Sequence, residues 1–206
     1  MLIRLLSEAD LKSVANIHSM TFPESALTKF GAESIRRYYL WQLNGPHKSL
    51  CIGAFDETKM VGFCFAGVFR EAETGFLRKN RIFLIWRIMT HPWLLNNEIV
   101  RDRINYGLQA LKRLARKKKA QAAQPKPAVE RFGILSIAVH PQYQALGIGK
   151  LLMADVETSA RQGGFNLMRL SVHPNNRQAV LFYEGLGWKK KLTNGAWEGY
   201  MEKSLD

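Results

Sequence analysis

The sequence predicts an α/β fold built on a mixed β-sheet. Three observations support this prediction: apolar strand-like segments are interleaved with helical patterns, a helical pattern follows each of the last two internal strands, and the chain closes with a hairpin. Of the 206 residues 47% are hydrophobic, which is enough for a sizeable core. The length fits one domain, or one domain with an elaboration.

The first third of the chain is predicted to hold a strand, two helices and a hairpin. The elements are a strand at Leu2–Leu6, a helix from Ser7 to about Ser19, a helix at Leu27–Leu43, and strands at Lys48–Phe55 and Met60–Phe69. Ser7 and Asp10 have the spacing of a capping box, and Asn44-Gly45-Pro46 is a strong helix stop. Four polar residues join the two apolar strands, which therefore read as a hairpin.

Two cysteines lie in this hairpin. If Asp56 pairs with Lys59, the register places Cys51 opposite Cys64. Two cysteines are too few for a disulfide framework and have no metal-ligand spacing, so we expect buried thiols, no metal, and a reducing cytoplasmic compartment. The N-terminal residues lack the pattern of a signal peptide, and no run of 18 apolar residues occurs, so no spanning helix is expected.

The last third of the chain alternates strands and helices. The predicted elements are a strand at Phe132–Val139, a helix at about Gly147–Gln162, a strand at Asn166–Val172, a helix at Asn176–Leu186, and a hairpin of Trp188–Leu192 with Trp197–Lys203. Gly163-Gly164 and Gly187 stop the two helices, and Asn194-Gly195 is a turn dipeptide typical of hairpins.

Residues 70–131 are unusually basic. They contain 15 Lys/Arg and 5 Asp/Glu, so they contribute +10 of the chain's formal charge of +13. Within them, Arg81–Leu95 is apolar with two tryptophans, a helix is predicted from about Asn97 to Ala120, and Gln121–Ala128 reads as a linker. A field of this sign favours anionic partners.

Three interpretations of this basic segment stay open. It is a helical elaboration that packs on the domain or on a second copy in a homodimer. Alternatively, residues 78–95 make a peripheral, in-plane membrane contact, with apolar and basic side chains alongside one another. Nucleic acid is the third candidate partner, through Arg113–Lys119, although that run lacks interleaved aromatic residues.

The sharpest chemical signal is the junction of strand and helix from Val139 to Lys150, VHPQYQALGIGK. Its two glycines allow the backbone to approach a ligand closely, and the free N–H groups and dipole of a helix start attract an anion. Lys150 adds positive charge. The spacing matches neither a Walker loop nor a dinucleotide motif, and Gly-x-Gly alone also fits an ordinary turn. The junction predicts a pyrophosphate site.

Two segments resemble the GCN5-related N-acetyltransferase (GNAT) superfamily. Gln144-x-x-Gly147-x-Gly149 is similar to the coenzyme A motif of that family. Residues 176–188 resemble its Asn-x-x-Ala-x-x-x-Tyr-Glu-x-x-Gly-Phe segment, with Trp188 in place of the phenylalanine. The resemblance implies a GNAT-like, mostly antiparallel twisted sheet flanked by helices in a single acyl-CoA N-acyltransferase domain over residues 1–206. Residues 70–131 would be a basic helical insertion between its third and fourth strands.

The resemblance also implies roles for the matching residues. The strand before the motif would offer backbone groups to the pantetheine arm and to an oxyanion, Asn176 would bond the same arm, and Tyr183 would be the general acid near the thioester sulfur. The residues expected to contact acetyl-CoA are Ile137, Ala138, Val139, Gln144, Ala145, Leu146, Gly147, Ile148, Gly149, Lys150, Asn176 and Tyr183.

The general base is where the sequence departs from the family. Many relatives place a glutamate on one of the two central strands, whereas residues 132–139 and 166–172 contain no Asp or Glu. His173 is our candidate catalytic base, with His140 and Glu24 as further options, because histidine titrates near neutral pH. Both histidines precede a proline, so the alternative is a purely structural role in a turn.

These observations together predict an acetyl-CoA-dependent N-acetyltransferase, cytoplasmic or membrane-peripheral. It would act on a small-molecule primary amine by direct attack in a ternary complex. Amino sugars, sugar nucleotides and membrane-associated metabolites are candidate acceptors. The alternative is a non-catalytic acyl-CoA-binding or adaptor module whose basic segment binds membrane or nucleic acid.

Overall fold

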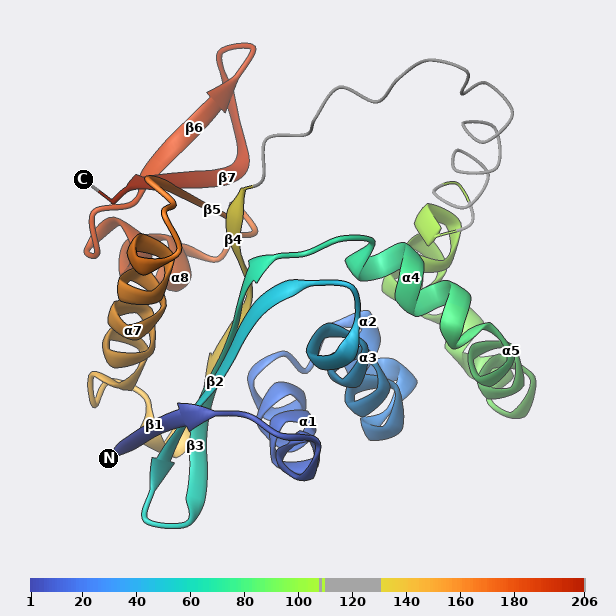
Figure 1. Ribbon diagram of the computed structural model, residues 1–206. Helices are drawn as coiled ribbons and strands as arrows, with labels where there is room; N and C mark the ends of the chain where they lie inside the picture. Colours follow the sequence, from blue (N-terminus) through green and yellow to red (C-terminus); the bar gives the residue numbers. More distant parts are fainter. Residues whose placement is uncertain (108, 110–130, 206) are drawn as a thin grey trace. The chain divides into compact units, whose positions relative to one another are not determined.

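The computed structural model describes residues 1–107, 109 and 131–205. They belong to two compact units. The first comprises Met1–Leu6, His47–Phe69 and the residues after 130, and the second comprises Ser7–Pro46 together with residues from Arg70 onward. The first unit carries the β-sheet, and the described part of the second is helical (Figure 1).

The first unit is built on a seven-stranded sheet with the order β1-β2-β3-β4-β5-β7-β6. Its strands are β1 (Leu2–Leu5), β2 (Lys48–Asp56), β3 (Lys59–Val68), β4 (Phe132–Val139), β5 (Leu167–Ser171), β6 (Lys189–Thr193) and β7 (Ala196–Ser204). Among these described strands, β4 and β5 run parallel and every other neighbouring pair is antiparallel. The prediction of a mixed, mostly antiparallel sheet flanked by helices is confirmed.

Two helices pack side by side against this sheet (Figure 1). They are α7 (Ile148–Gln162) and α8 (Arg177–Glu184), and a short 3-10 turn, η3 (Pro141–Tyr143), precedes α7. Every fourth residue of α7 from Ile148 to Ala160 is buried, which gives one apolar stripe facing the core. Glu157 is also buried and accepts bonds from Lys203 Nζ on β7 at 2.7 and 2.8 Å.

The predicted register of the β2–β3 hairpin was wrong by one residue. Asp56 pairs with Lys59 as expected, but a β-bulge beside Ala54 shifts the rest of the ladder, so that Cys51 lies opposite Phe65 and Cys64 opposite Ile52. Because side chains alternate across a strand, the two sulfurs point to opposite faces of the sheet. Both thiols are free and buried, as predicted.

The closing hairpin has the turn that its sequence predicts. Asn194 and Gly195 both have positive φ, 51° and 81°, which is the requirement of a type I′ turn between β6 and β7.

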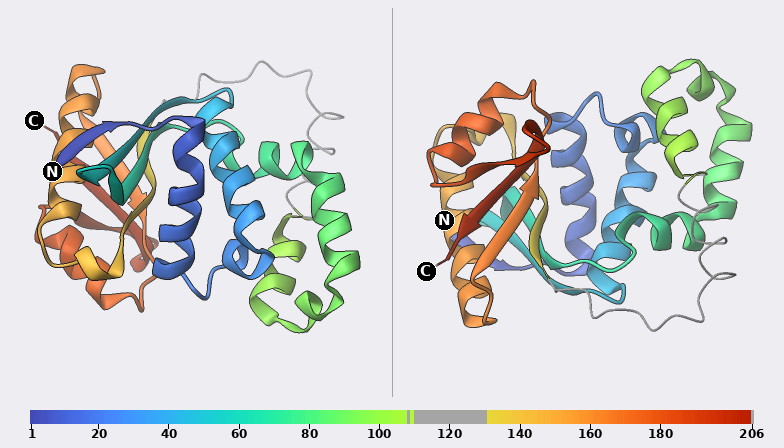
Figure 2. Two further views of the ribbon diagram at one scale, coloured as in Figure 1. Left: turned by 90° about the horizontal axis from the view of Figure 1, so that it is seen from below. Right: turned by 90° about the horizontal axis from the view of Figure 1, so that it is seen from above.

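The described part of the second unit is helical, and one small apolar cluster within it consists of Phe30, Leu94 and Val100. The elements are η1 (Glu8–Asp10), α1 (Leu11–Thr21), α2 (Ala26–Phe30), α3 (Ala32–Asn44), α4 (Ala72–Lys79), α5 (Arg81–Thr90), η2 (Pro92–Asn96) and a helix over residues 98–107. These helices are coloured from blue to green in Figure 2. The capping box is present, since Ser7 N and Oγ both donate to Asp10 Oδ2 at 2.8 Å.

The single helix predicted over Leu27–Leu43 was wrong, because Gly31 divides it into α2 and α3. Gly31 has a φ of +95°, which interrupts the helical backbone. A β-carbon at this position would lie 2.9 Å from an Arg87 guanidinium nitrogen. A side chain from a distant part of the chain thus lies against the break, and its Nε donates to Phe30 O at 2.9 Å.

The basic segment is described as far as residue 107, and at 109. The predicted helix that starts near Asn97 is present over residues 98–107. The remainder of that helix, the linker at Gln121–Ala128 and the basic run Arg113–Lys119 lie outside the described residues. That residues 70–131 form an insertion in a single domain stays a prediction. Within the described part of the chain, no helix combines the length and apolarity needed to cross a membrane.

Candidate active site

The two parallel strands separate at the centre of the sheet. The ladder between β4 and β5 covers three residue pairs and ends at Ile134 and Leu170. Beyond that point β5 stays bound to β7, with Ser171 opposite Tyr200 and Val172 N donating to Gly199 O at 2.8 Å. Although β4 is the fourth of seven strands, only Phe132 and Ala138 in it are fully buried. The carboxyl half of β4 therefore borders an open edge.

A β-bulge determines which backbone groups of β4 face this edge. The partner of Phe65 on β3 is Ser136, whereas the partner of Ala66 is Ile134, so Leu135 is the extra residue. After the bulge, His140 N donates to Val61 O at 2.8 Å and therefore faces β3. Since backbone groups alternate along a strand, those of Ile137 and Val139 face the open edge. Ala138 faces β3 and pairs with Phe63.

A strained turn connects β4 to α7. Gln144 Nε2 donates to Val139 O at 3.1 Å, which folds the turn back over the strand end. Ala145 and Gly147 have φ values of 63° and 80°. Left-handed residues in such a turn aim successive N–H groups toward one side, which is the backbone geometry of an anion-binding concavity.

The start of α7 completes this concavity. Gly147 is its N-cap and supplies no side-chain cap, and the first turn carries no acidic residue. The first backbone bond of the helix is Leu151 N to Gly147 O at 3.1 Å, so the preceding amides are available to a ligand. Space around Gly147 is open, since a β-carbon added there would meet no atom within 4 Å beyond its chain neighbours, and Lys150 is exposed nearby. The residues present fit a pyrophosphate.

Gly149 has a different function from Gly147. A β-carbon at Gly149 would lie 3.2 Å from the Phe182 ring on α8, so the glycine permits close approach of the two helices. Sequence reasoning did not single out Phe182, although it directly precedes the candidate acid Tyr183. The contact brings the start of α7 to the segment that carries this tyrosine.

Helix α8 presents Asn176 and Tyr183 on the first unit. Asn176 is its N-cap, and its Oδ1 accepts a bond from Ala179 N at 3.1 Å. Its Nδ2 is thus the atom that can donate to a ligand. Tyr183 is 8% exposed and stacks edge-on with Phe182 and with Trp188, at centroid distances of 5.2 and 6.0 Å.

The surroundings of Tyr183 keep its hydroxyl protonated. Burial raises the pKa of this phenol well above its ordinary value, and the nearby Cys64 thiol raises it further. Cys64 lies opposite Ile137 across β3 and β4, and sequence reasoning did not connect it with the site. Tyr183 is therefore protonated at neutral pH and can donate a proton or a hydrogen bond.

His140 and His173 occupy equivalent turns at the ends of the two parallel strands. Each ring accepts a backbone N–H at Nδ1, from Gln142 at 3.3 Å and from Asn175 at 3.2 Å. A neutral ring that accepts at Nδ1 carries its hydrogen on Nε2. His173 therefore presents a donor at Nε2, and it must release the Asn175 bond before Nδ1 can take a proton. Its role as a base stays a prediction.

The described residues contain no candidate binding site for a metal ion. Among them, no group of three or more His, Cys, Asp or Glu side chains is placed to bind one. The chemistry suggested by the geometry is that of an anionic ligand on backbone amides, beside a protonated phenol and an open strand edge.

A sheet that opens beside a glycine-rich helix start is the arrangement of an α/β transferase that takes its donor as a phosphate-bearing thioester. The chain belongs to the acetyltransferase (GNAT) family, whose sequence model matches residues 11–188. The family predicted from the two sequence segments is thereby confirmed.

One curated relative is similar in sequence, and several solved structures are similar in fold. The spermidine N(1)-acetyltransferase of Thermoplasma acidophilum is 30% identical over 112 residues, which are 54% of this chain and 69% of that protein. The structure of the PaiA N-acetyltransferase of T. acidophilum in complex with coenzyme A superimposes with a TM-score of 0.59 at 17% identity, over 98% of both chains. An aminoglycoside 6′-N-acetyltransferase from Acinetobacter haemolyticus gives 0.57 at 13% identity, over 94% of both chains.

Proposed function

We propose that the protein transfers an acetyl group from acetyl-CoA to a small-molecule primary amine, by direct attack in a ternary complex. The observation that carries this proposal is the open edge of β4 next to the uncapped start of α7. The amides from Ala145 to Lys150 would hold the pyrophosphate, and the β4 edge with Asn176 would hold the pantetheine arm. Gln144 N is not among them, because it donates to Pro141 O at 3.3 Å. Acetyl-CoA supplies the thioester whose carbonyl carbon is attacked.

The residues of this chain can assist each bond change. The amine nitrogen forms the new C–N bond, the C–S bond breaks, and the proton lost by the amine passes to water. Backbone N–H groups that face the open edge can stabilise the negative charge that develops on the carbonyl oxygen. Tyr183 donates its proton to the departing sulfur and regains one from water, so the net proton balance is a transfer from the amine to the thiol. Its raised pKa keeps the hydroxyl protonated at the start of each cycle.

Two arguments bear on the acceptor and favour different amines. The relative that acetylates spermidine, by its name, supports an aliphatic polyamine. The formal charge of +13 opposes a polycation and supports a neutral or anionic amine such as an amino sugar or a sugar nucleotide. A panel of spermidine, glucosamine and nucleotide-linked amino sugars, with release of free thiol as the readout, separates these classes.

Substitution of Tyr183→Phe tests the enzyme against the non-catalytic alternative. We expect kcat to fall by about 10²-fold with little change in the KM for acetyl-CoA, because the proton donor is lost and the ring is kept. Tyr200→Phe, which changes an exposed tyrosine on β7, is the matched control. A protein that binds coenzyme A but shows no turnover with any amine would support the binding-module alternative. Absence of coenzyme A binding in calorimetry would overturn both.

A further inference from the structure

A cavity of about 320 Å³ lies within the helices of the second unit. Its lining comes from α2, α3, α4, α5 and residues 103–107 of the following helix. None of the residues assigned above to the acetyl-CoA site lines it. The volume is at the lower end of the range for small-ligand pockets and corresponds to about ten water molecules.

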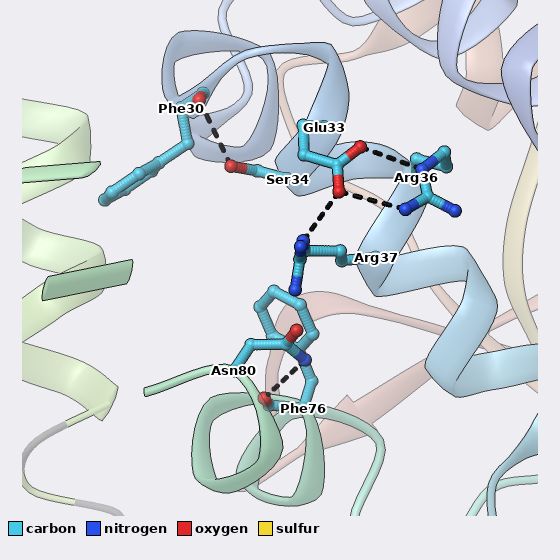
Figure 3. A network of polar contacts seen from close by, with 7 residues as sticks. All are labelled: Phe30, Glu33, Ser34, Arg36, Arg37, Phe76 and Asn80. Carbon is cyan, nitrogen blue, oxygen red and sulfur yellow. Dashed lines mark hydrogen bonds and ion pairs between the residues drawn. The ribbon is translucent and has the colours of Figure 1, made fainter. Parts of the chain in front are cut away.

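The walls of the cavity are apolar. They are formed chiefly by Phe30, Phe76, Leu77, Leu84, Ile88 and Ile104. The Ser34 hydroxyl, which also lines the cavity, is already used, since it donates to Phe30 O at 3.1 Å (Figure 3). A polar ligand would lose hydrogen bonds with water and gain few from these walls, so the body of a ligand must be apolar.

The corner between α4 and α5 holds this wall in place. Asn80 is buried, and its Nδ2 donates to Phe76 O at 3.1 Å, as Figure 3 shows. Gly75 on α4 lies against the Trp41 ring, where an added β-carbon would be 2.3 Å from the nearest atom. The cavity is thus bounded by packed helices.

Besides Ser34, five polar or charged residues line the cavity: Tyr38, Glu73, Arg81, Arg103 and Tyr106. Arg103 forms an ion pair with Glu73. Burial raises the pKa of Tyr38, with Glu73 raising it further and Arg103 opposing, so all three groups interact and the phenol stays protonated. Arg81 has no ion-pair partner among the described residues, so the lining carries a net charge of +1.

We propose that this cavity binds a single alkyl chain with an anionic head group, in the class of medium-chain carboxylates. The apolar walls would enclose the chain, and Arg81 would bind the head group. If each methylene takes roughly the volume of one water, the cavity holds about ten carbons. This site is independent of the proposed acetyl transfer.

The test is a calorimetric titration of the whole protein with decanoate below its micelle concentration, with decanol as the uncharged probe. Arg81→Gln should weaken decanoate binding by about tenfold and leave decanol binding unchanged, because the lost contact is to a charged group. Arg101→Gln removes the same charge from an exposed arginine that does not line the cavity, and should leave both affinities unchanged.

Gly107→Leu tests whether the cavity itself is the site. Its added side chain enters the cavity, and the nearest atom to the new β-carbon is the flexible Leu77 Cδ1 at 3.0 Å. Leucine also has a higher helix propensity than glycine, so the variant should fold, which circular dichroism checks. We expect loss of saturable decanoate binding in this variant.

Two results would overturn the proposal: no saturable binding of decanoate to the native protein, or equal binding to folded Gly107→Leu. Vesicles of phosphatidylglycerol and phosphatidylcholine identify the source of the chain. If they compete with decanoate in the native protein and equally in a variant with Ile82→Ser and Met89→Ser, which lacks two exposed apolar side chains outside the cavity, the chain comes from a bilayer lipid. If they do not, it is a free carboxylate. Both outcomes keep the chemistry of the proposal.

Discussion

His18 lies buried in α1 between two hydroxyl groups. Its Nδ1 is 2.9 Å from Tyr39 Oη, and its Nε2 is 3.0 Å from Ser25 Oγ. Ser25 caps α2 by accepting a bond from Thr28 N at 3.1 Å. Burial lowers the pKa of His18 from 6.5 to about 4, so the ring is neutral at pH 7 and links three helices of the second unit through hydrogen bonds.

The lowered pKa of His18 predicts acid sensitivity. Between pH 6.5 and 4 the unfolded chain binds a proton at His18 that the folded chain does not. The stabilising contribution of the neutral ring to the free energy of unfolding is therefore fully present above pH 6.5 and is lost as the pH falls. The free energy of unfolding should drop by about 3 kcal/mol over this window. Urea unfolding at pH 7.5 and 4.5 measures it, with His18→Gln as the comparison. An equally steep loss in His18→Gln would show that other groups are responsible.

His173 can serve as a base or as a turn residue, and two substitutions separate these roles. His173→Asn keeps an acceptor for Asn175 N–H but cannot titrate, whereas His173→Ala removes both properties. If the ring is a base, both variants should lose about 10²-fold in kcat and the acid limb of the pH–rate profile. If it only supports the turn, Asn should retain activity and Ala should lose it. His140→Asn is the control at the equivalent turn.

Single residues with a strong local pattern were the ones that the sequence predicted best. Asn176 and Tyr183 stand in a recognisable segment and lie on the same helix. His18 has no such pattern, because its neutrality depends on burial between α1 and α3. Likewise, the proximity of Cys64 to Tyr183 results from the packing of α8 against the sheet, which joins residues more than a hundred positions apart.

The two ends of helix α7 each carry a glycine with positive φ. Gly147 has a φ of +80° at the start and Gly164 a φ of +77° after the end, and both face open space. Alanine at either position would be strained by about 1–2 kcal/mol without a steric clash. Alanine should therefore destabilise the fold by a similar amount at either site, although only Gly147 lies at the proposed anion site.

This pair of glycines permits a matched test of the anion site. Gly147→Ala and Gly164→Ala should lower the free energy of unfolding by similar amounts in denaturant titrations. Only Gly147→Ala should raise the KM for acetyl-CoA, by about tenfold, because it disturbs the amides that would hold the pyrophosphate. Equal KM values in the two variants would place the pyrophosphate elsewhere.

Helices and strands were predictable where the hydrophobic periodicity of a segment ends at a clear stop signal. Strand β4 has the predicted bounds, and α7 differs from its prediction by one residue at the start. The division of α2 from α3 was missed because the helical pattern over Leu27–Leu43 was taken as one element, and the positive φ of Gly31 is visible only in the structure. The β2 bulge was missed because a bulge depends on the partner strand, and polar loop residues alone suggested a regular hairpin.

In the molecule as a whole, the basic segment carries most of the net positive charge and also exposes apolar side chains. No residue of α5 is fully buried, although its sequence, RIFLIWRIMT, is mostly apolar and aromatic. Its exposed side chains include Ile82, Trp86 and Met89, and Trp93 is 61% exposed. The composition alone left membrane, second copy and nucleic acid open, since a sequence does not reveal which face of a helix stays uncovered.

Membrane contact through residues 78–95 stays a prediction that sedimentation with vesicles can check. We expect the protein to bind vesicles that contain phosphatidylglycerol, and binding to weaken with added salt. The double change Ile82→Ser and Met89→Ser should reduce binding by about tenfold. Leu181→Ser, at an exposed leucine on α8, is the control. Dimerisation lost in the double variant, without vesicle binding, would favour a second copy instead.

The placement of the two thiols makes the sheet unit separately observable. Cys51 and Cys64 are the two cysteines of this 206-residue sequence, both are buried in the sheet, and they point to opposite faces. Alkylation by a small reagent must therefore wait until this unit opens. The rate of alkylation, followed as an increase in mass, therefore measures the opening of the sheet unit. The helical unit has no cysteine, so its opening does not contribute to the signal. A ligand that lowers the alkylation rate of the thiols must therefore stabilise the sheet unit.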